Sequence, residues 1–315
     1  MATRVTTSLV DIPDQLLDPF IKKIQHSAVI PQLSAAEPMK FGKGVFSSFD
    51  TDEAEFVGEG GEKGPSDVTK SGGTILPFKF QKTVRFTNEV DWADEDHRLQ
   101  VISTILAQIP RPLARALDIG LIHAVNPKTG VPVTAMQSHG YLAQASATRA
   151  ATSDIIADLD WAYAKVLTNG YVPNGVALAP SLAVKAVVAR NANKEKLFPE
   201  FRPTTEASTL DAFRASTSDT VSKVGNIVAI AGDFDAVRWG VQRQMGIERI
   251  EFGDPDGLGD LKRRNEIAFR AEVVYGWGIA DLAAFALLTD DSSSSAAASS
   301  SAAASSSSAA SSSAA

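Results

Sequence analysis

The sequence predicts an α+β fold, in which helices and strands are mixed without the regular alternation of a βαβ protein. Three observations lead to this prediction. A stretch at 74–90 alternates apolar and polar residues with the two-residue period of a strand. A segment at 99–121 repeats leucine and isoleucine at steps of three and four residues, the period of a helix. Short apolar runs and further helical patterns then follow one another irregularly up to residue 290.

Residues 1–40 predict an N-terminal arm that contains one short helix. Leu16, Phe20 and Ile24 recur at helical spacing, and Pro13 stands near the start of this pattern. Pro31 is expected to end the helix, because proline cannot donate the backbone hydrogen bond that would continue it.

Residues 41–90 predict a long β-hairpin. Its first arm has phenylalanine and valine scattered among glycines and acids, which suits extended chain better than helix. Its second arm, "TILPFKFQKTVRFTNEV", places Phe78 and Phe80 on one side of a strand together with Lys82, Val84 and Phe86. An isolated two-stranded ribbon is marginally stable in water, so this aromatic side is expected to be exposed in the subunit and to contact another subunit.

The stretch "EFVGEGGEKGPSDV" at 55–68 joins the two arms and poses a choice between a phosphate loop and a flexible hairpin tip. A phosphate loop needs a lysine followed by Ser or Thr and the start of a helix. Here Lys63 is followed by Gly64 and Pro65, and four glutamates surround the glycines: Glu53, Glu55, Glu59 and Glu62. A phosphate would meet net negative charge, so the pattern favours the tip of a hairpin whose glycines allow positive φ.

The leucine and isoleucine pattern predicts one long helix over about 93–124. Acidic residues cluster at its start, where the helix dipole favours negative charge: Asp91, Asp94, Glu95 and Asp96. Pro110 and Pro112 lie inside the pattern, whose phase continues past them, and this predicts a bend rather than two helices.

The second half of the chain predicts a compact mixture of helices and strands. "SDIIADLDWAYAKVLTNG" is typical of a helix with Ser153 or Asp154 as N-cap and Gly170 as its end. "GVALAP" predicts a buried strand, Pro180 opens another helix, and 191–222 is expected to be a long loop. "GNIVAIAGDF" and "NEIAFRAEVVYGWGI" predict two more strands. Residues 291–315 are a Ser/Ala low-complexity tail, expected to be a disordered extension.

Composition narrows the classes of function. The chain has 315 residues and no cysteine, which excludes disulfides, thiolate metal sites and thiol catalysis. Its formal net charge of −7 gives no general attraction to nucleic acid or to an anionic membrane. The N-terminus does not have the pattern of a secretory signal and no apolar run is long enough to span a bilayer, so we expect a cytoplasm-like setting and no membrane partner.

The catalytic and ligand-binding motifs in this sequence are incomplete. The sequence therefore predicts neither an enzyme nor a cofactor. "DPDGLGD" at 254–260 places Asp and Gly as an EF-hand does, but Leu258 and Asn265 occupy positions that require ligands, so a hairpin turn is favoured. "DEDH" at 94–97 could form a metal or acid–base cluster, but on a helix its side chains would point to different faces. "KTG" at 128–130 occurs without the S-x-x-K that accompanies it in penicillin-recognising enzymes. No nucleophile, base and oxyanion donor assemble.

Several segments, taken with the order of the parts, carry a resemblance to a known family. They are "VGEGGEKGPSD", "WADEDHRLQV", "ARALDIGLIHAVNPKTG", "NGVALAPSLA" and "AGDFDAVRWGVQRQMGIERIEF". Over about residues 5–290 the chain resembles the major capsid proteins of tailed bacteriophages, which have the Hong Kong 97-like fold, and is most similar to those of phages that infect actinobacteria.

The resemblance implies a division of the chain and a structural function. It implies an N-terminal arm at 1–40, an extended loop with flanking peripheral strands at 41–90 and a spine helix at 91–125. A mainly axial domain at 126–233 and return strands to the peripheral domain at 234–290 would follow. It implies pentamers and hexamers of an icosahedral shell that encloses double-stranded DNA in the virion, assembled in the cytoplasm of the bacterial host. A separate scaffolding protein, a portal and decoration proteins are the implied partners, and covalent cross-linking through Lys63 or Lys70 is not expected.

The residues predicted to contact neighbouring subunits lie at the hairpin tip and along its second arm. They are Glu59, Gly60, Gly61, Glu62, Lys63, Phe78, Phe80 and Arg85. Two other functions stay open at this point. One is the shell of an encapsulin-type nanocompartment, which shares the fold, and the other is an enzyme that binds a nucleotide at the glycine-rich loop.

Overall fold

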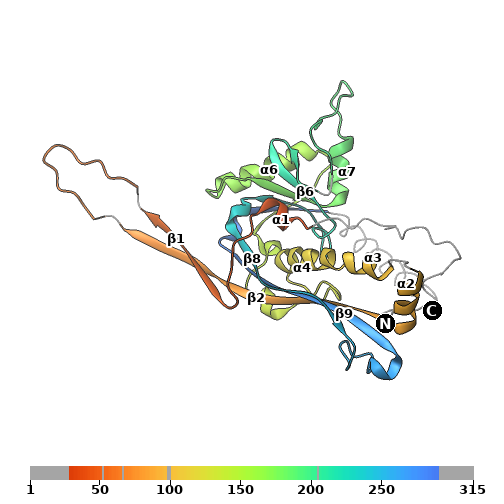
Figure 1. Cartoon of the computed structure of the whole chain (residues 1–315). Coiled ribbons are helices and arrows are strands. Elements are labelled where there is room, and N and C mark those ends of the chain that lie inside the picture. Colours follow the sequence, from red (N-terminus) through yellow and green to blue (C-terminus); the bar gives the residue numbers. More distant parts are fainter. Residues whose placement is uncertain (1–27, 52, 66, 98–100, 204–205, 291–315) are drawn as a thin grey trace, which may run out of the picture. The chain divides into compact units, whose positions relative to one another are not determined.

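The computed structural model describes residues 28–290 except 52, 66, 98–100 and 204–205 (Figure 1). The chain divides into two compact units. Within the described range, the first unit consists of Ala36–Ile102 and Val237–Ala280, and the second of residues 28–35, Ser103–Ala236 and 281–290. Both contain helix and sheet, so the α+β prediction is confirmed. The helix predicted around Leu16 to Ile24 and the Ser/Ala tail lie outside the described residues.

The first unit contains a four-stranded antiparallel sheet in the order β1-β2-β9-β8. Its strands are β1 (Gly44–Thr51), β2 (Val68–Thr87), β8 (Val237–Ile250) and β9 (Glu266–Ile279), and it also holds helix α2 (Asn88–His97) and the short 3-10 helix η3 (Lys262–Arg264). β2 pairs with β9 from Leu76 onward and with β1 over residues 68–75. β1, residues 68–75 and the tip between them therefore form a two-stranded ribbon, the predicted hairpin, which Figure 1 shows in red and orange.

Aromatic rings fill one face of the first unit's sheet. Phe78 stacks on Trp277 with ring centroids 4.1 Å apart, and Phe80 lies 6.1 Å from the same ring. Phe86 packs edge-on against Phe269 at 5.8 Å. The expected exposure of this aromatic side was wrong, because Phe78 and Phe80 are each only 8% exposed. Burial of such rings is the main stabilising contribution of this face.

The predicted long helix is interrupted. Instead of one bent helix over 93–124, the chain forms α2, α3 (Val101–Ala107) and α4 (Pro110–His123). Between α3 and α4, Gln108 and Ile109 donate their backbone N–H groups three residues back, in the 3-10 pattern. Pro110 has no N–H to donate, so the regular four-residue ladder cannot continue through this point.

The second unit is built on a six-stranded mixed sheet in the order β3-β10-β7-β4-β6-β5. The strands are β3 (Ala147–Ala150), β4 (Gly175–Leu178), β5 (Ser208–Leu210), β6 (Phe213–Thr217), β7 (Ile227–Gly232) and β10 (Phe285–Thr289). Besides most of α3 and all of α4, its helices are α1 (Ile30–Leu33), α5 (Thr134–Gln137), α6 (Ile155–Thr168) and α7 (Pro180–Val188), with 3-10 turns η1 (Leu142–Gln144), η2 (Phe234–Ala236) and η4 (Leu282–Ala284). The central strands β4 and β7 are buried along their whole length.

In the second unit, two predictions made from local sequence patterns were confirmed and two were wrong. Asp154 caps α6 by accepting from two backbone N–H groups, and Gly170 follows that helix with φ of 88°. Pro31 does not end a helix but stands in the first turn of α1. The predicted loop at 191–222 contains the β5–β6 hairpin, whose turn residues Asp211 and Ala212 both have positive φ.

A buried carboxylate holds the start of α1 to α4. Asp118 accepts hydrogen bonds from the backbone N–H of Val29 at 2.6 Å and of Ile30 at 3.0 Å, and from the hydroxyl of Thr220 at 2.8 Å. Burial raises the pKa of Asp118 to about 6, although these hydrogen bonds and the charge of Arg115 act to lower it. Three segments far apart in sequence are thus joined at one side chain.

Replacing Asp118 by Asn is expected to change how stability depends on pH. The folded-state pKa of about 6 lies above the ordinary 3.8, so the stability that this carboxyl contributes is fully present below pH 3.8 and is lost as pH rises through 6. A shift of about two units corresponds to roughly 3 kcal/mol. In urea unfolding of the isolated subunit, the free energy of unfolding of the wild type relative to Asp118→Asn should fall by about that amount from about pH 4 to about pH 7. A difference that stays constant with pH would contradict this prediction.

Candidate assembly interface

The tip of the ribbon is an exposed turn. The backbone N–H of Gly61 donates to the carbonyl of Gly58 at 3.0 Å, and Gly60 has φ of 79°. Glu59, Glu62 and the other described residues of this turn are exposed, as is Lys63. The described chain on both sides of the turn is not helical, so the helix N-terminus that a phosphate loop requires is not present here.

One face of the ribbon carries exposed apolar side chains. Val45, Phe49 and Val68 are 72%, 67% and 60% exposed. In the antiparallel register Phe49 is opposite Lys70 and Thr51 is opposite Val68, which places all of these residues on the same side. The ammonium group of Lys70 lies 5.9 Å from the centre of the Phe49 ring, in agreement with that register. We call Val45, Phe49 and Val68 the apolar face of the ribbon.

The structure separates the predicted contact residues into two groups. Glu59, Gly60, Gly61, Glu62 and Lys63 lie together at the exposed tip. Phe78, Phe80 and Arg85 lie on the part of β2 that pairs with β9, and all three are buried. Contacts of either group with a neighbouring subunit stay predictions. The apolar face was missed, although its signal is present in the sequence as Val45 and Phe49, four residues apart on an alternating strand.

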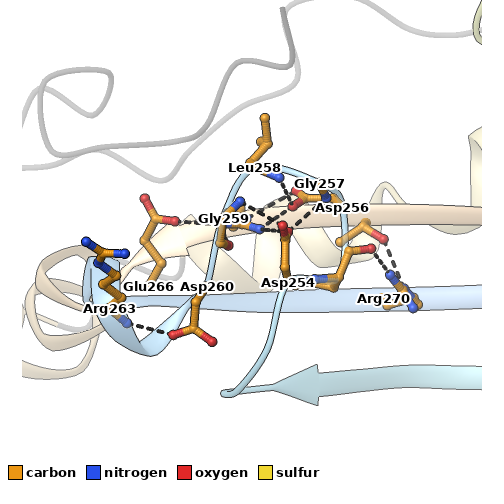
Figure 2. A network of polar contacts seen from close by, with 12 residues as sticks. Asp254, Asp256, Gly257, Leu258, Gly259, Asp260, Arg263, Glu266 and Arg270 are labelled. Atoms are coloured by element: carbon orange, nitrogen blue, oxygen red, sulfur yellow. Dashed lines mark hydrogen bonds and ion pairs between the residues drawn. The ribbon is translucent and has the colours of Figure 1, made fainter.

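Arg85 is held by a network of carboxylates on the loop between β8 and β9 and at the start of β9. Figure 2 shows this loop with Asp254, Asp256 and Glu266. Its side chain is 2% exposed, and its Nη atoms lie 2.9 Å from Glu266 and 3.1 Å from Asp254. Asp256 accepts from Nε and from an Nη, and the carbonyl of Gly259 accepts from the other Nη at 2.9 Å. All five N–H groups of the guanidinium are therefore used within the chain.

The charges in this network support one another. Burial alone would lower the pKa of Arg85, but the hydrogen bonds and charges of Asp256 and Glu266 outweigh it and raise that pKa. Asp254 also closes the loop by accepting from the backbone N–H groups of Gly257 at 2.8 Å and Gly259 at 3.0 Å. Within its own chain, Arg85 thus anchors the loop between β8 and β9.

The "DPDGLGD" segment lies in the loop that joins β8 to β9, as the hairpin-turn prediction required. Asp254 and Asp256 direct oxygens at the guanidinium of Arg85. In the part of the chain that the structure describes, no group of three or more His, Cys, Asp or Glu side chains is arranged to hold a metal ion. Among the same residues, no helix is both long and apolar enough to cross a bilayer.

Comparison with known proteins gives a consistent result over nearly the whole chain. A solved structure from Mycobacterium phage Ogopogo is 36% identical, covers 91% of this chain and 100% of its own, and superposes with a TM-score of 0.78. One from Gordonia phage Cozz is 27% identical, covers 90% of this chain and 92% of its own, and has a TM-score of 0.75. No curated protein gives a significant sequence match.

A more distant similarity extends the fold beyond these phages. The capsid of an empty GTA particle, computed with C5 symmetry, is 13% identical, covers 89% of this chain and 95% of its own, and has a TM-score of 0.59, which shows the shared fold. The sequence model of the phage capsid family matches residues 10–290, which include both units and the ribbon. With this match and the 36% identical structure from a mycobacterial phage, the chain belongs to the phage capsid family.

Proposed function

We propose that this capsid shell protein is the major capsid subunit of a tailed phage, and that its copies form the pentamers and hexamers of an icosahedral head around double-stranded DNA. The observation that carries the proposal is the ribbon, which presents an apolar face to solvent in a chain that is similar to phage capsid structures over its length. Its role is structural rather than catalytic.

The ribbon supports the proposed assembly because it has little stability of its own without a surface to pack against. A two-stranded ribbon without a packed face is marginal in water. Val45, Phe49 and Val68 are mostly exposed, and covering them on a neighbouring subunit would contribute about 3–5 kcal/mol per ribbon before the costs of association. Many such contacts, repeated around a closed shell, add up to a stable particle even when each is weak.

The tip adds a polar component to the same contact. Glu59, Glu62 and Lys63 are exposed beside the glycines, where their charges can pair with groups on a neighbour. We propose that Gly60, with its positive φ, lets the tip adjust to that surface. Phe78 and Phe80 support the contact indirectly, by packing the sheet from which the ribbon extends.

The net charge of −7 fits a shell that contains DNA without reading its sequence. We also propose a separate scaffolding protein, a portal and decoration proteins as partners, with assembly in the cytoplasm of the bacterial host. These partners follow from the function proposed for the shell.

The contents of purified particles test this function. Particles from cells that express the chain together with its neighbouring genes should appear as closed shells by electron microscopy. After external nuclease treatment and disruption, they should release double-stranded DNA. Shells that contain a packaged enzyme and no DNA would instead indicate a nanocompartment. Saturable nucleotide binding by the isolated subunit that is lost in Lys63→Ala would indicate an enzyme.

A further inference from the structure

The segment at 36–42, which leads into the ribbon, is tied at both ends to the outer edge of β8. At one end the backbone N–H of Glu37 donates to the carbonyl of Trp239 at 2.8 Å. At the other end the side-chain amide of Gln242 holds Gly42. The N–H of Gly42 donates to Oε1 of Gln242 at 3.0 Å, and Nε2 of Gln242 donates to the carbonyl of Gly42 at 2.9 Å. One side chain thus satisfies both backbone groups of a residue, as a neighbouring strand would.

A β-bulge makes the Gln242 side chain available for this pairing. In the ladder between β8 and β9, Val241 is opposite Tyr275 and Arg243 is opposite Val274, so Gln242 is an extra residue without a partner on β9. Bulges of this kind redirect a side chain out of the regular alternation of the strand. Here the redirected side chain is the amide that reaches Gly42.

Three glycines leave room for the arrangement. A Cβ at Gly276 would lie 2.5 Å from Nε2 of Gln242, and a Cβ at Gly240 would lie 2.1 Å from the carbonyl oxygen of Glu37. Gly42 itself has φ of 125°, which strains any residue with a side chain. The close approach of 36–42 to the sheet therefore depends on the absence of side chains at these positions.

We propose that Gln242 is a positioning residue for the ribbon: its amide fixes the point at which β1 leaves the sheet and so the direction in which the ribbon meets a neighbouring subunit. β1 begins at Gly44, two residues after the held glycine. The ladder between β2 and β9 begins at Leu76, beyond the part of β2 that pairs with β1. The base of the ribbon is therefore held on the β8 side through Gly42. This inference rests on the proposed function for its effect on assembly, but the clamp itself can be measured in the subunit alone.

The Gln242→Met variant tests the clamp, because methionine keeps the length of the side chain and removes the amide. Amide hydrogen exchange of Gly42 should rise about five- to tenfold, the effect of losing one net hydrogen bond. The melting temperature of the subunit should stay within a few degrees of wild type, while the fraction of protein in closed shells should fall several-fold. Gln244→Met, at an exposed position on the same strand, should change none of these quantities.

Gly276→Ala provides a second variant that leaves Gln242 in place and displaces its amide by contact, so it should reproduce both effects. Wild-type exchange at Gly42 in both variants would overturn the clamp. Faster exchange with unchanged assembly would overturn the positioning role. If the wild type itself forms no shells, the proposed function fails, whereas the exchange of Gly42 still decides whether the clamp exists.

Discussion

Phe49→Asp is expected to abolish shell assembly and to leave the subunit folded. Phe49 is 67% exposed and lies on the ribbon, away from the aromatic core of the sheet, so its replacement removes little burial from the isolated subunit. On a neighbouring subunit the same position would bury an aspartate among apolar groups. Removing a carboxylate from water costs several kcal/mol, which Lys70, directly opposite on the ribbon, would offset only in part, because its ammonium would lose water as well. Sedimentation and electron microscopy should show subunits or small oligomers, with circular dichroism like that of the wild type.

Thr69→Asp is the matched control for this variant. Thr69 is exposed on the same ribbon, but the register places it on the opposite side from Phe49. The Thr69→Asp substitution adds the same charge at nearly the same position along the ribbon, and assembly should continue. Equal loss of assembly in both variants would show that charge on the ribbon, rather than its apolar face, is responsible. Normal shells from Phe49→Asp would contradict the proposed role of the face.

Arg85→Met is expected to destabilise the subunit by about 3–5 kcal/mol, because it leaves a buried carboxylate without its partner. Glu266 is only 1% exposed at its side chain and would lose the guanidinium that lies 2.9 Å away. Asp254 and Asp256 would lose the same cation, and the loop between β8 and β9 would lose its anchor (Figure 2). Urea unfolding of the isolated subunit measures the change as a lower midpoint of the transition.

Lys79→Met is the comparison for this second variant. Lys79 stands on the same strand and pairs with Glu272 at 2.6 Å, but its side chain is 60% exposed. An exposed ion pair contributes about 0–1 kcal/mol, so little change is expected. The double variant Arg85→Met/Glu266→Gln should recover part of the loss by removing the buried charge that Arg85 no longer neutralises. Similar effects of Arg85→Met and Lys79→Met would contradict the account of a buried network.

Periodicity predicted those parts of the fold that depend on local sequence. The strand through Phe78 and Phe80, the capped helix that starts after Asp154 and the buried strand at 227–232 each carry their own repeat or cap. The glycine-rich tip was also predicted, because turn chemistry is local. The β5–β6 hairpin escaped prediction since its strands are three and five residues long and its turn, Asp211 and Ala212, does not have the usual glycine.

Most of the features that could not be predicted depend on contacts between residues that are far apart in the sequence. The partners of Arg85 within the chain were not predicted, because they lie about 170–180 residues away and no local pattern links them. Its contact with another subunit stays a prediction. The interruption before Pro110 depends on how hydrogen bonds redistribute around a missing donor, which the preserved hydrophobic phase conceals. The bulge at Gln242 exists only in the register of β8 against β9. The apolar face likewise needs the register of β1 against β2 before Val68 joins Phe49.

A reconstruction of assembled particles by electron cryo-microscopy tests the central claim most directly, because it shows where the ribbon lies. The account predicts closed icosahedral shells in which residues 44–75 of each subunit lie on an adjacent subunit, with Val45, Phe49 and Val68 covered by that neighbour. A chain that remains monomeric with and without its neighbouring gene products would contradict the account. So would shells in which this face of the ribbon remains in solvent.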